Sequence, residues 1–399
     1  MIRPLPYGRQ VIEDDDIAAV VAALRSDTLT TGPAVTEFER ALSAITVAPH
    51  SVVCSSGTAA LHLAALALDL GPGDAVVVPS LTFLATANAA RYVGAEVVFA
   101  DVDPATGLMG PQHLEEALTR CGGLTPRAVF PVHLNGQCVA MADLAATARR
   151  HGLAIVEDAC HAIGSRQELS DGWHPTGACG ASDMAVFSFH PVKTVAMGEG
   201  GAITTRDERL AARLRSLRSH GMERDPTRFT QADEAFDAEG RPNPWYYEMA
   251  VPGFNYRASD IACALGTSQL AKLDRFRTRR TELVAAYDAA LAPLAPMVSP
   301  VHRIGHCRPS WHIQVALIDF ATAGIGRAQV MHALTGRKIF TQVHYLPVHR
   351  QPYYRQRYPG VDLPGADAYY DRCLTLPLFV GMTEDDVDRV AAALREVLG

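Results

Sequence analysis

The sequence predicts an α/β protein whose first two hundred or so residues form a doubly wound, mostly parallel sheet. Two observations carry this prediction. Short apolar, β-branched runs recur along the chain, and helix-like segments separate them. The runs are apolar throughout rather than alternating, which is typical of strands that helices cover on both faces.

The apolar runs give the expected strands in order. They are Val52–Cys54, Ala75–Pro79, Glu96–Asp103, Ala128–His133, Leu153–Ala159, Met184–Phe189 and Gly201–Thr205. Helices are expected between them, among others at 58–68, 110–120 and 141–152. Ligands of open α/β sheets bind beyond the carboxyl ends of the strands, so the residues that follow these runs are the first candidates for a site.

The pattern changes after about Arg206. Residues 222–248 are polar and contain prolines, which indicates a long functional loop. One strong helix is expected from Ser259, as its N-cap, through Leu291. Beyond about residue 300 strand and helix patterns alternate less regularly, as in a smaller α+β domain. The chain is therefore divided into a large domain, 1–260, and a linking helix with a small C-terminal domain, 261–399.

Composition excludes several classes of protein. The 399 residues are 48% apolar and 20% charged, with a net charge of −7 and scattered arginines, which argues against nucleic acid or an anionic membrane as partner. The N-terminus lacks the apolar core of a signal peptide, and the stretch 59–70 is too short to span a bilayer. Eight cysteines without a CxxC pair indicate reduced thiols in the cytoplasm, and the pair His344 and His349 does not have a recognised metal-ligand spacing, so no metal site is expected.

Lysine is rare in this chain. Of 36 basic residues, only Lys193, Lys272 and Lys338 are lysines, and arginine cannot give up its proton at neutral pH. Lys193 lies between an expected strand and the glycine-rich stretch 198–201, where backbone can approach a ligand closely. A partly desolvated amine there has a lowered pKa and can form a Schiff base. The alternative is an ordinary surface lysine, and this is the expectation for Lys272 and Lys338, which lie among charged residues.

Two further candidates lie at the end of the strand expected at 153–159. Asp158 can pair with a pyridinium nitrogen, whose proton must be kept if the ring is to accept electrons. The alternative for Asp158 is a helix N-cap. His161 would share a helical face with Asp158, although a lone histidine is more often structural.

The stretch "SSGTAAL" at 55–61 joins an expected strand to an expected helix. Backbone N–H groups at such a helix start form an anion site, although Ser and Thr caps are common everywhere; the N–H groups belong to Gly57, Thr58 and Ala59. Phe83 follows the strand ending at Pro79 and is either a ring-stacking residue or part of the core. The fingerprints of dinucleotide-binding folds, P-loop proteins and α/β-hydrolases do not occur.

Assembled, these motifs resemble the DegT/DnrJ/EryC1/StrS sugar aminotransferases, in the family's order and over nearly the whole chain. The stretches that carry the resemblance are "TLTTGPAVTEFE", "SSGTAALHLAALAL", "PSLTFLATANAA", "VEDACHAIG", "FSFHPVKTVAMGEGGAITT", "RSHGM" and "GFNYRASDIACALGTSQLAKLD". The resemblance implies a fold-type-I enzyme that uses pyridoxal 5′-phosphate to aminate nucleotide-linked keto sugars.

The resemblance also implies a role for each cofactor residue. Lys193 would form the Schiff base with pyridoxal phosphate and move the proton of the reaction. Asp158 would hold the pyridine nitrogen, and His161 would lie near the ring hydroxyl. Phe83 would stack on the ring, and Asn255 would reach the phosphate held by a neighbouring subunit, which makes an active homodimer. The phosphate would be bound by Gly57, Thr58, Ala59 and Ser188.

Within the family, "RSHGMERDP", "PWYYEMAVPGFNYR", "TQVHYLPVHRQPYY" and "LTLPLFVGMTEDDVDRV" are most similar to the pseudaminic-acid branch. This similarity implies C4 amination of UDP-2-acetamido-2,6-dideoxy-β-L-arabino-hex-4-ulose with L-glutamate as donor. The residues that it implies near the sugar nucleotide are Thr31, His220, Trp245, Tyr246, Tyr247, His344 and Tyr345. The alternative for each aromatic residue is packing in the core or in an interface.

Three other functions are compatible with parts of the pattern. A sister enzyme could aminate another nucleotide sugar, such as a perosamine, legionaminic or bacillosamine precursor. The family's dehydratase offshoot has a histidine in place of the lysine, and Lys193 argues against it. A fold-type-I sensor or scaffold would be expected to lose the lysine, the aspartate or the phosphate turn, and all three are present here.

Overall fold

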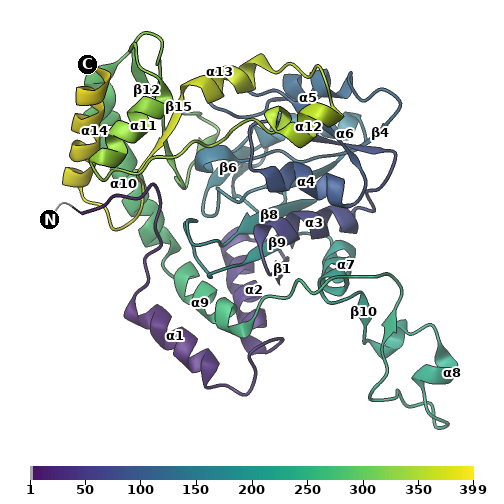
Figure 1. The fold of residues 1–399 in the computed structure, drawn as a ribbon. Helices are drawn as coiled ribbons and strands as arrows, with labels where there is room; N and C mark the ends of the chain where they lie inside the picture. Colours follow the sequence, from purple (N-terminus) through teal and green to yellow (C-terminus); the bar gives the residue numbers. More distant parts are fainter. Residues whose placement is uncertain (1–2) are drawn as a thin grey trace.

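The computed structural model describes residues 3–399, and a seven-stranded sheet lies at its centre (Figure 1). The strands are β1 (His50–Cys54), β2 (Asp74–Pro79), β3 (Glu96–Ala100), β4 (Thr125–Val129), β5 (Ala154–Asp158), β8 (Met184–Ser188) and β9 (Gly201–Thr205). Their order in space is β1-β9-β8-β5-β4-β2-β3. Strand β9 is antiparallel to β1 and β8, and the other neighbouring pairs are parallel. The predicted α/β fold with a mostly parallel central sheet is therefore confirmed.

Helices flank this sheet. They are α2 (Pro33–Thr46), α3 (Gly57–Ala67), α4 (Leu84–Tyr92), α5 (Pro111–Leu118), α6 (Met141–Arg150) and α7 (Glu208–Arg218). Helix α1 (Asp14–Leu24) packs instead on α9 (Asp260–Leu270) (Figure 1). Helix α3 packs on β8, β9, α4 and α7, and it is buried on nearly every side because its residues are apolar all round. Within residues 3–399, no helix is long and apolar enough to cross a membrane.

The strands differ from the sequence-based bounds mainly at their ends. Strand β9 has the predicted bounds, Gly201–Thr205, whereas β4 begins at Thr125 and ends at Val129 instead of continuing to His133. The chain remains extended to Val132, which bridges to Asp158. Pro131 interrupts the ladder because proline has no N–H group to donate.

The C-terminal part builds a second core on an antiparallel three-stranded sheet, β12-β14-β15. Helices α10 and α14 pack together over it, and Leu5 joins this core because it pairs with Ile339. The division of the chain at about residue 260 stays a prediction. The elements here are α9 (Asp260–Leu270), α10 (Leu273–Leu291), η3 (Ala292–Leu294), β12 (Val298–Pro300), β14 (Gln314–Ile318), α11 (Arg327–Gly336), η4 (Val348–Arg350), α12 (Pro352–Arg357), α13 (Pro364–Arg372), β15 (Cys373–Leu376) and α14 (Glu384–Leu398).

Two expectations for this region were wrong. The helix expected from Ser259 to Leu291 is two helices, α9 and α10, that meet at Lys272, although Ser259 caps α9 by accepting a hydrogen bond from Ala262 N–H. Lys272 is also not solvated: it is 9% exposed and contacts the carboxylates of three residues at the start of α1, namely Glu13, Asp15 and Asp16. These carboxylates come from a segment far away in the sequence, so the charged residues next to Lys272 did not predict its burial.

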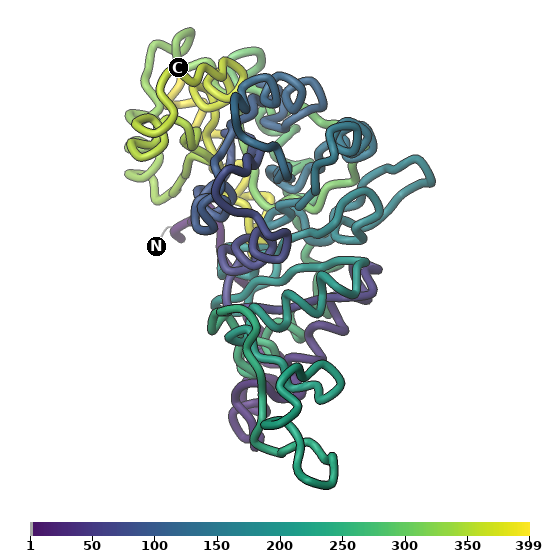
Figure 2. The backbone as a smooth tube through the Cα atoms, turned by 90° about the vertical axis from the view of Figure 1, so that its right-hand side faces the viewer, coloured from purple at the N-terminus to yellow at the C-terminus, as the bar shows by residue number. Residues whose placement is uncertain are grey.

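Residues 222–248 form an arm that projects from the body of the molecule (Figure 1), and Figure 2 shows its tip at the opposite end from the C-terminus. The arm has its own contacts: Phe229 packs edge-on against Tyr246, and Glu248 accepts hydrogen bonds from Thr230 and Gln231. Its elements are β10 (Met222–Glu223), η2 (Pro226–Arg228), α8 (Ala232–Ala235) and β11 (Glu248–Met249). The predicted long loop is thus an organised segment.

The remaining elements lie beside the carboxyl ends of β4 and β5. Strand β6 pairs with β7 and β13, and a short 3-10 turn, η1, follows the extended segment after β4. His312 N–H donates to the carbonyl of Asn135 in this turn, which connects the segment before β14 to the large sheet. The bounds are η1 (Leu134–Gly136), β6 (Arg166–Leu169), β7 (Gly172–Pro175) and β13 (Cys307–Arg308).

Candidate active site

A cavity of about 510 Å³ lies beyond the carboxyl ends of β1, β5 and β8. The three strands run in the same direction, because β1 and β8 are both antiparallel to β9, so residues that follow them meet at one edge. Nine of the predicted site residues line this cavity. They are Gly57, Thr58, Phe83, Asp158, His161, Ser188, Lys193, His344 and Tyr345.

Lys193 belongs to the return loop between β8 and β9. Its N–H donates to the carbonyl of His190, and its side chain enters the cavity. Burial there lowers the pKa of the Lys193 amine, while the nearby Asp158 carboxylate acts in the opposite direction. An amine with a lowered pKa loses its proton more readily, as a nucleophile or base must.

Asp158 is the last residue of β5 and is 5% exposed. Its Oδ2 accepts a hydrogen bond from Thr86 Oγ1 at 2.7 Å, and its Oδ1 accepts from Cys160 N–H at 3.2 Å. The second bond closes a tight turn, so Asp158 caps no helix, and the expectation that His161 shares a helical face with it was wrong. The turn nevertheless brings both side chains to the cavity.

Three histidines surround the amine of Lys193 in this cavity. His161 Nε2 lies 2.9 Å from Tyr345 Oη, and the ring of His312 lies 4.4 Å from the ring of His161. Burial lowers the pKa of His161 and of His312 well below the usual range, and the charge of Lys193 adds to this effect. Burial also lowers the pKa of His344 to about 3. All three rings are therefore neutral at pH 7, which suits hydrogen bonding rather than salt bridges.

The turn from β1 into α3 offers backbone N–H groups to an anion. A Cβ atom at Gly57 would lie 2.8 Å from Ser188 Cβ, so only glycine lets this turn approach the end of β8. Ser56 Oγ accepts a hydrogen bond from Ala59 N–H at 3.1 Å as the N-cap of α3. The N–H group of Ala59, expected to face an anion, is thus already paired, and those of Gly57 and Thr58 open the helix at the cavity.

Phe83 is not part of the core. It is 56% exposed at the start of α4, and its ring centre lies 6.1 Å from that of Tyr345, across the cavity. The alternative that Phe83 packs in the core was therefore wrong. An exposed ring beside Asp158 is available to stack on a planar ligand.

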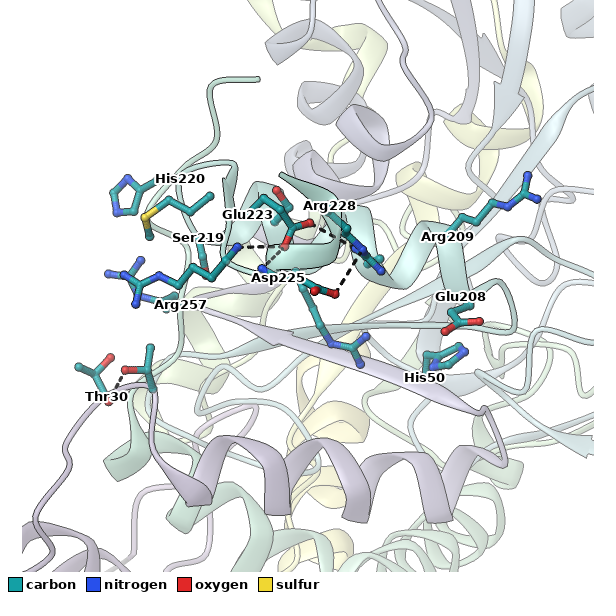
Figure 3. A pocket seen from close by; sticks show the side chains of 16 residues that line it. Thr30, His50, Glu208, Arg209, Ser219, His220, Glu223, Asp225, Arg228 and Arg257 are labelled. Carbon is teal, nitrogen blue, oxygen red and sulfur yellow. Dashed lines mark hydrogen bonds and ion pairs between the residues drawn. The ribbon is translucent and has the colours of Figure 1, made fainter. Parts of the chain in front are cut away.

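The other predicted residues lie elsewhere. Thr31 and His220 line a second cavity of about 1250 Å³ between α7 and the base of the arm (Figure 3). Within the described chain this cavity shares no lining residue with the first. Asn255 lines neither cavity, but its backbone bridges to that of Ser219, which lines the second cavity. The three remaining predicted residues belong to the arm. The side chains of Trp245 and Tyr247 are 73% and 53% exposed, and the hydroxyl of Tyr246 donates a hydrogen bond to Glu248.

Sequence reasoning missed several residues of the first cavity. Thr82 and Thr86 line it beside Asp158, and His312 lines it beside His161. The i, i+4 spacing of the two threonines at an expected helix start was the available signal. No local sequence pattern could have identified His312, because this residue lies 151 positions after His161 in the chain.

The free groups of the cavity fit pyridoxal phosphate. Asp158 can hold the protonated pyridine nitrogen, Lys193 can bind the aldehyde carbon, and the turn at Gly57 can bind the phosphate. His161 Nδ1 and His312 Nδ1 are buried and have no hydrogen-bond partner among residues 3–399, so the site has polar atoms to spare for a ligand.

Comparisons with known proteins give matches over nearly the whole chain. The model of the DegT/DnrJ/EryC1/StrS aminotransferase family matches residues 10–395. The spore coat polysaccharide biosynthesis protein SpsC of Bacillus subtilis (strain 168) is 39% identical over 398 residues, which covers 99% of this chain and 97% of SpsC.

Solved structures share the whole fold. PseC of Helicobacter pylori, an aminotransferase of pseudaminic acid biosynthesis, is 26% identical with a TM-score of 0.87 and covers 99% of each chain. DesI, solved in the presence of its TDP-sugar product, is 34% identical with a TM-score of 0.84, covering 100% of this chain and 94% of its own. The PLP form of a putative sugar aminotransferase, Spr1654 of Streptococcus pneumoniae, is 26% identical with a TM-score of 0.85 over 99% of each chain.

The fold, the position of Lys193 and these comparisons lead to one assignment. The chain has the fold of type I pyridoxal phosphate enzymes, and its family uses pyridoxal phosphate for transamination. The expected enzyme class and cofactor are confirmed. This chain belongs to the DegT/DnrJ/EryC1/StrS aminotransferase family and is a sugar aminotransferase.

Proposed function

We propose that this enzyme aminates C4 of UDP-2-acetamido-2,6-dideoxy-β-L-arabino-hex-4-ulose, with L-glutamate as amino donor, to give UDP-4-amino-4,6-dideoxy-N-acetyl-β-L-altrosamine. The observation that carries the chemistry is that Lys193, Asp158 and the Gly57 turn meet in one cavity. The choice of sugar is supported by the motifs quoted above and by the likeness to PseC over both whole chains. The product would enter the biosynthesis of pseudaminic acid.

The proposed roles follow from the positions of the side chains. Bound pyridoxal phosphate supplies an electron sink for the carbanion that forms when the donor loses its α-proton. Lys193 would take that proton from the α-carbon of glutamate and return it at C4′ of the cofactor. Asp158 would hold a proton at the pyridine nitrogen. In the second half-reaction Lys193 would move a proton in the opposite direction, which would leave the amine on C4 of the sugar.

A second subunit is part of this proposal. Among residues 3–399, no arginine lines the cavity that holds Lys193, so no guanidinium group there can pair with a nucleotide diphosphate. The cavity of Thr31 and His220 is lined by arginines, namely Arg209, Arg215, Arg224, Arg228 and Arg257. A homodimer that places this surface and Asn255 over the partner's Lys193 cavity would complete the site. The exposed Trp245 and Tyr247 of the arm are available for the same contact.

A sister substrate is the second candidate. SpsC is 39% identical to this chain, compared with 26% for PseC, and SpsC serves spore coat polysaccharide biosynthesis. DesI, at 34%, has a TDP-sugar product. These identities favour a nucleotide-linked sugar as substrate. The substrate panel described next determines which nucleotide and which sugar the enzyme uses.

A substrate panel tests the proposal. The purified enzyme with pyridoxal phosphate and glutamate would be offered UDP- and TDP-linked 4-keto-6-deoxy sugars, and each product would be identified by mass spectrometry and NMR. We expect the highest kcat/KM with the UDP-linked β-L-arabino ketosugar and an amine at C4 of its product. A kcat/KM at least tenfold higher with another sugar would overturn the substrate assignment. If 2-oxoglutarate is released during turnover of that sugar, the assignment of the enzyme as an aminotransferase would still hold.

A further inference from the structure

Two threonine hydroxyls form a chain that ends on the carboxylate of Asp158. Thr86 Oγ1 lies 2.7 Å from Asp158 Oδ2, and Thr82 Oγ1 lies 2.8 Å from Thr86 Oγ1. Thr86 is fully buried, Thr82 is 2% exposed, and Asp158 is 5% exposed. Water is therefore largely excluded from this chain, and each bond depends on the next.

The direction of the chain follows from the number of protons. An ionised carboxylate can only accept, so Thr86 must give its single hydroxyl proton to Asp158. Thr86 then has only lone pairs left for Thr82, and Thr82 must be the donor in the first bond. The order is thus fixed from Thr82 through Thr86 to Asp158.

The start of helix α4 positions both hydroxyls. Thr86 lies in the first turn of the helix, and Thr82 precedes the N-cap residue, Phe83. The bend of the chain at this N-cap brings the two hydroxyls within 2.8 Å of each other. Phe83, between them, presents its ring to the cavity. The other carboxylate oxygen, Asp158 Oδ1, accepts from Cys160 N–H. The carboxylate is thus held on both oxygens, and a lone pair on each remains for a ligand.

We propose that Thr82 and Thr86 are positioning residues that keep the cofactor's proton on its pyridine nitrogen rather than on Asp158. A hydrogen bond donated to a carboxylate weakens its attraction for a further proton, and a neighbouring donor strengthens that bond in a dry site. The proposal rests on the proposed role of Asp158. Asp158 could pair with the pyridine nitrogen without the two hydroxyls; the proposal adds that the hydroxyls determine where the shared proton lies.

The direct test replaces the Thr86 hydroxyl by a methyl group in Thr86→Val. The variant would be loaded with pyridoxal phosphate that carries an NMR-active ring nitrogen, and the chemical shift of that nitrogen would be recorded. We expect the signal to move toward the unprotonated position. We also expect kcat to fall roughly 10- to 100-fold, the range for loss of a hydrogen bond to a charged group. KM for either substrate should change little, because Thr86 positions another side chain.

Matched variants separate positioning from stability. Thr86→Ser keeps the hydroxyl and should restore both the signal and kcat. Thr204 is also fully buried and donates to the carbonyl of Gly177 at 2.8 Å, away from the cavity, so Thr204→Val loses a similar bond. It should leave the ring nitrogen unchanged. Thr82→Val reaches Asp158 only through Thr86 and should shift the signal in the same direction by a smaller amount.

The result that would overturn the proposal is a protonated ring nitrogen in Thr86→Val with kcat within twofold of the wild type. If Thr86→Val fails to fold or to bind the cofactor, an unchanged signal in Thr82→Val would overturn it instead. The NMR signal needs only the bound cofactor. A failure of the sugar assignment would therefore leave this test intact, and a failure of this test would leave the sugar assay unaffected.

Discussion

Tyr345 and His161 are joined by a hydrogen bond, with 2.9 Å between the phenol oxygen and Nε2. The two residues are 184 positions apart in the chain, and the bond connects the segment after α11 to the turn after β5. Burial lowers the pKa of His161 well below its usual range, so the ring is neutral and carries one proton. The tyrosine therefore fixes which way the histidine faces in the cavity.

The Tyr345→Phe variant tests this contact. We expect kcat to fall about fivefold, because loss of one buried hydrogen bond, worth about 1 kcal/mol, leaves His161 free to rotate. Tyr354→Phe is the matched control, since Tyr354 is also buried and its hydroxyl donates to Asn88 at 2.7 Å away from the cavity. Steady-state kinetics check the prediction. Equal activity losses in the two variants would show that the bond serves stability alone.

The buried histidines predict how stability depends on pH. Burial lowers the pKa of His344 to about 3 in the folded protein, while the usual value is near 6.5. Between these values the unfolded chain binds more protons, so the free energy of unfolding should fall as the pH drops below about 6.5. One such histidine contributes at most about 1.4 kcal/mol per pH unit.

Urea denaturation of the apoenzyme at pH 7 and pH 5 measures this slope. His344→Asn should show a smaller loss of stability than the wild type over the same range. His332→Asn, at an exposed position, serves as the control and should keep the wild-type slope. A wild-type stability that does not change between these pH values would contradict the prediction.

Lys272 predicts a large effect on stability. It bonds to Asp15 at 2.5 Å and to Asp16 at 2.8 Å, and the side chain of Asp16 is fully buried. Lys272→Met leaves that carboxylate without its cation, so we expect a loss of roughly 3 kcal/mol or more. Lys338→Met changes an exposed lysine and should cost less than about 0.5 kcal/mol. Thermal and urea unfolding compare the two variants, and similar losses in both would refute the buried ion network.

The hydrogen bonds of Glu248 are expected to keep the arm ordered. Its carboxylate accepts hydrogen bonds from the N–H groups of Thr230 and Gln231 and from the hydroxyl of Tyr246. Glu248→Ala should therefore speed amide hydrogen exchange across 222–248, and it should weaken the proposed dimer in sedimentation experiments. Glu239→Ala removes an exposed carboxylate from the same arm and is the control. An unchanged dimer affinity in Glu248→Ala would show that the arm is not part of the proposed interface.

Local sequence patterns predicted most elements and one cap. The bounds of β9 and the cap at Ser259 were correct, because apolar runs and capping side chains act over a few residues. Residues that depend on distant partners were predicted poorly. Lys272 is buried because α1 supplies its carboxylates, and the break between α9 and α10 occurs at the same residue.

The candidate site divides in the same way. Lys193 and Asp158 were identified because each lies at or beyond the end of an expected strand, and parallel strands bring such residues to one edge. Thr86 was missed because its importance lies in a bond to Asp158, 72 residues away. Thr31, His220 and Asn255 lie outside the Lys193 cavity in a single chain, so their proposed roles depend on a second subunit.

The central claim is that Lys193 holds the cofactor, and the scarcity of lysine makes it directly measurable. The enzyme would be loaded with pyridoxal phosphate, reduced with borohydride to fix the cofactor to its lysine, digested, and mapped by mass spectrometry. The chain has only three lysines, and we expect the phosphopyridoxyl group on Lys193, with Lys272 and Lys338 unmodified. Lys193→Arg, which keeps the charge, should carry no label and show no turnover. A label on Lys272 or Lys338, or turnover in Lys193→Arg, would contradict the account.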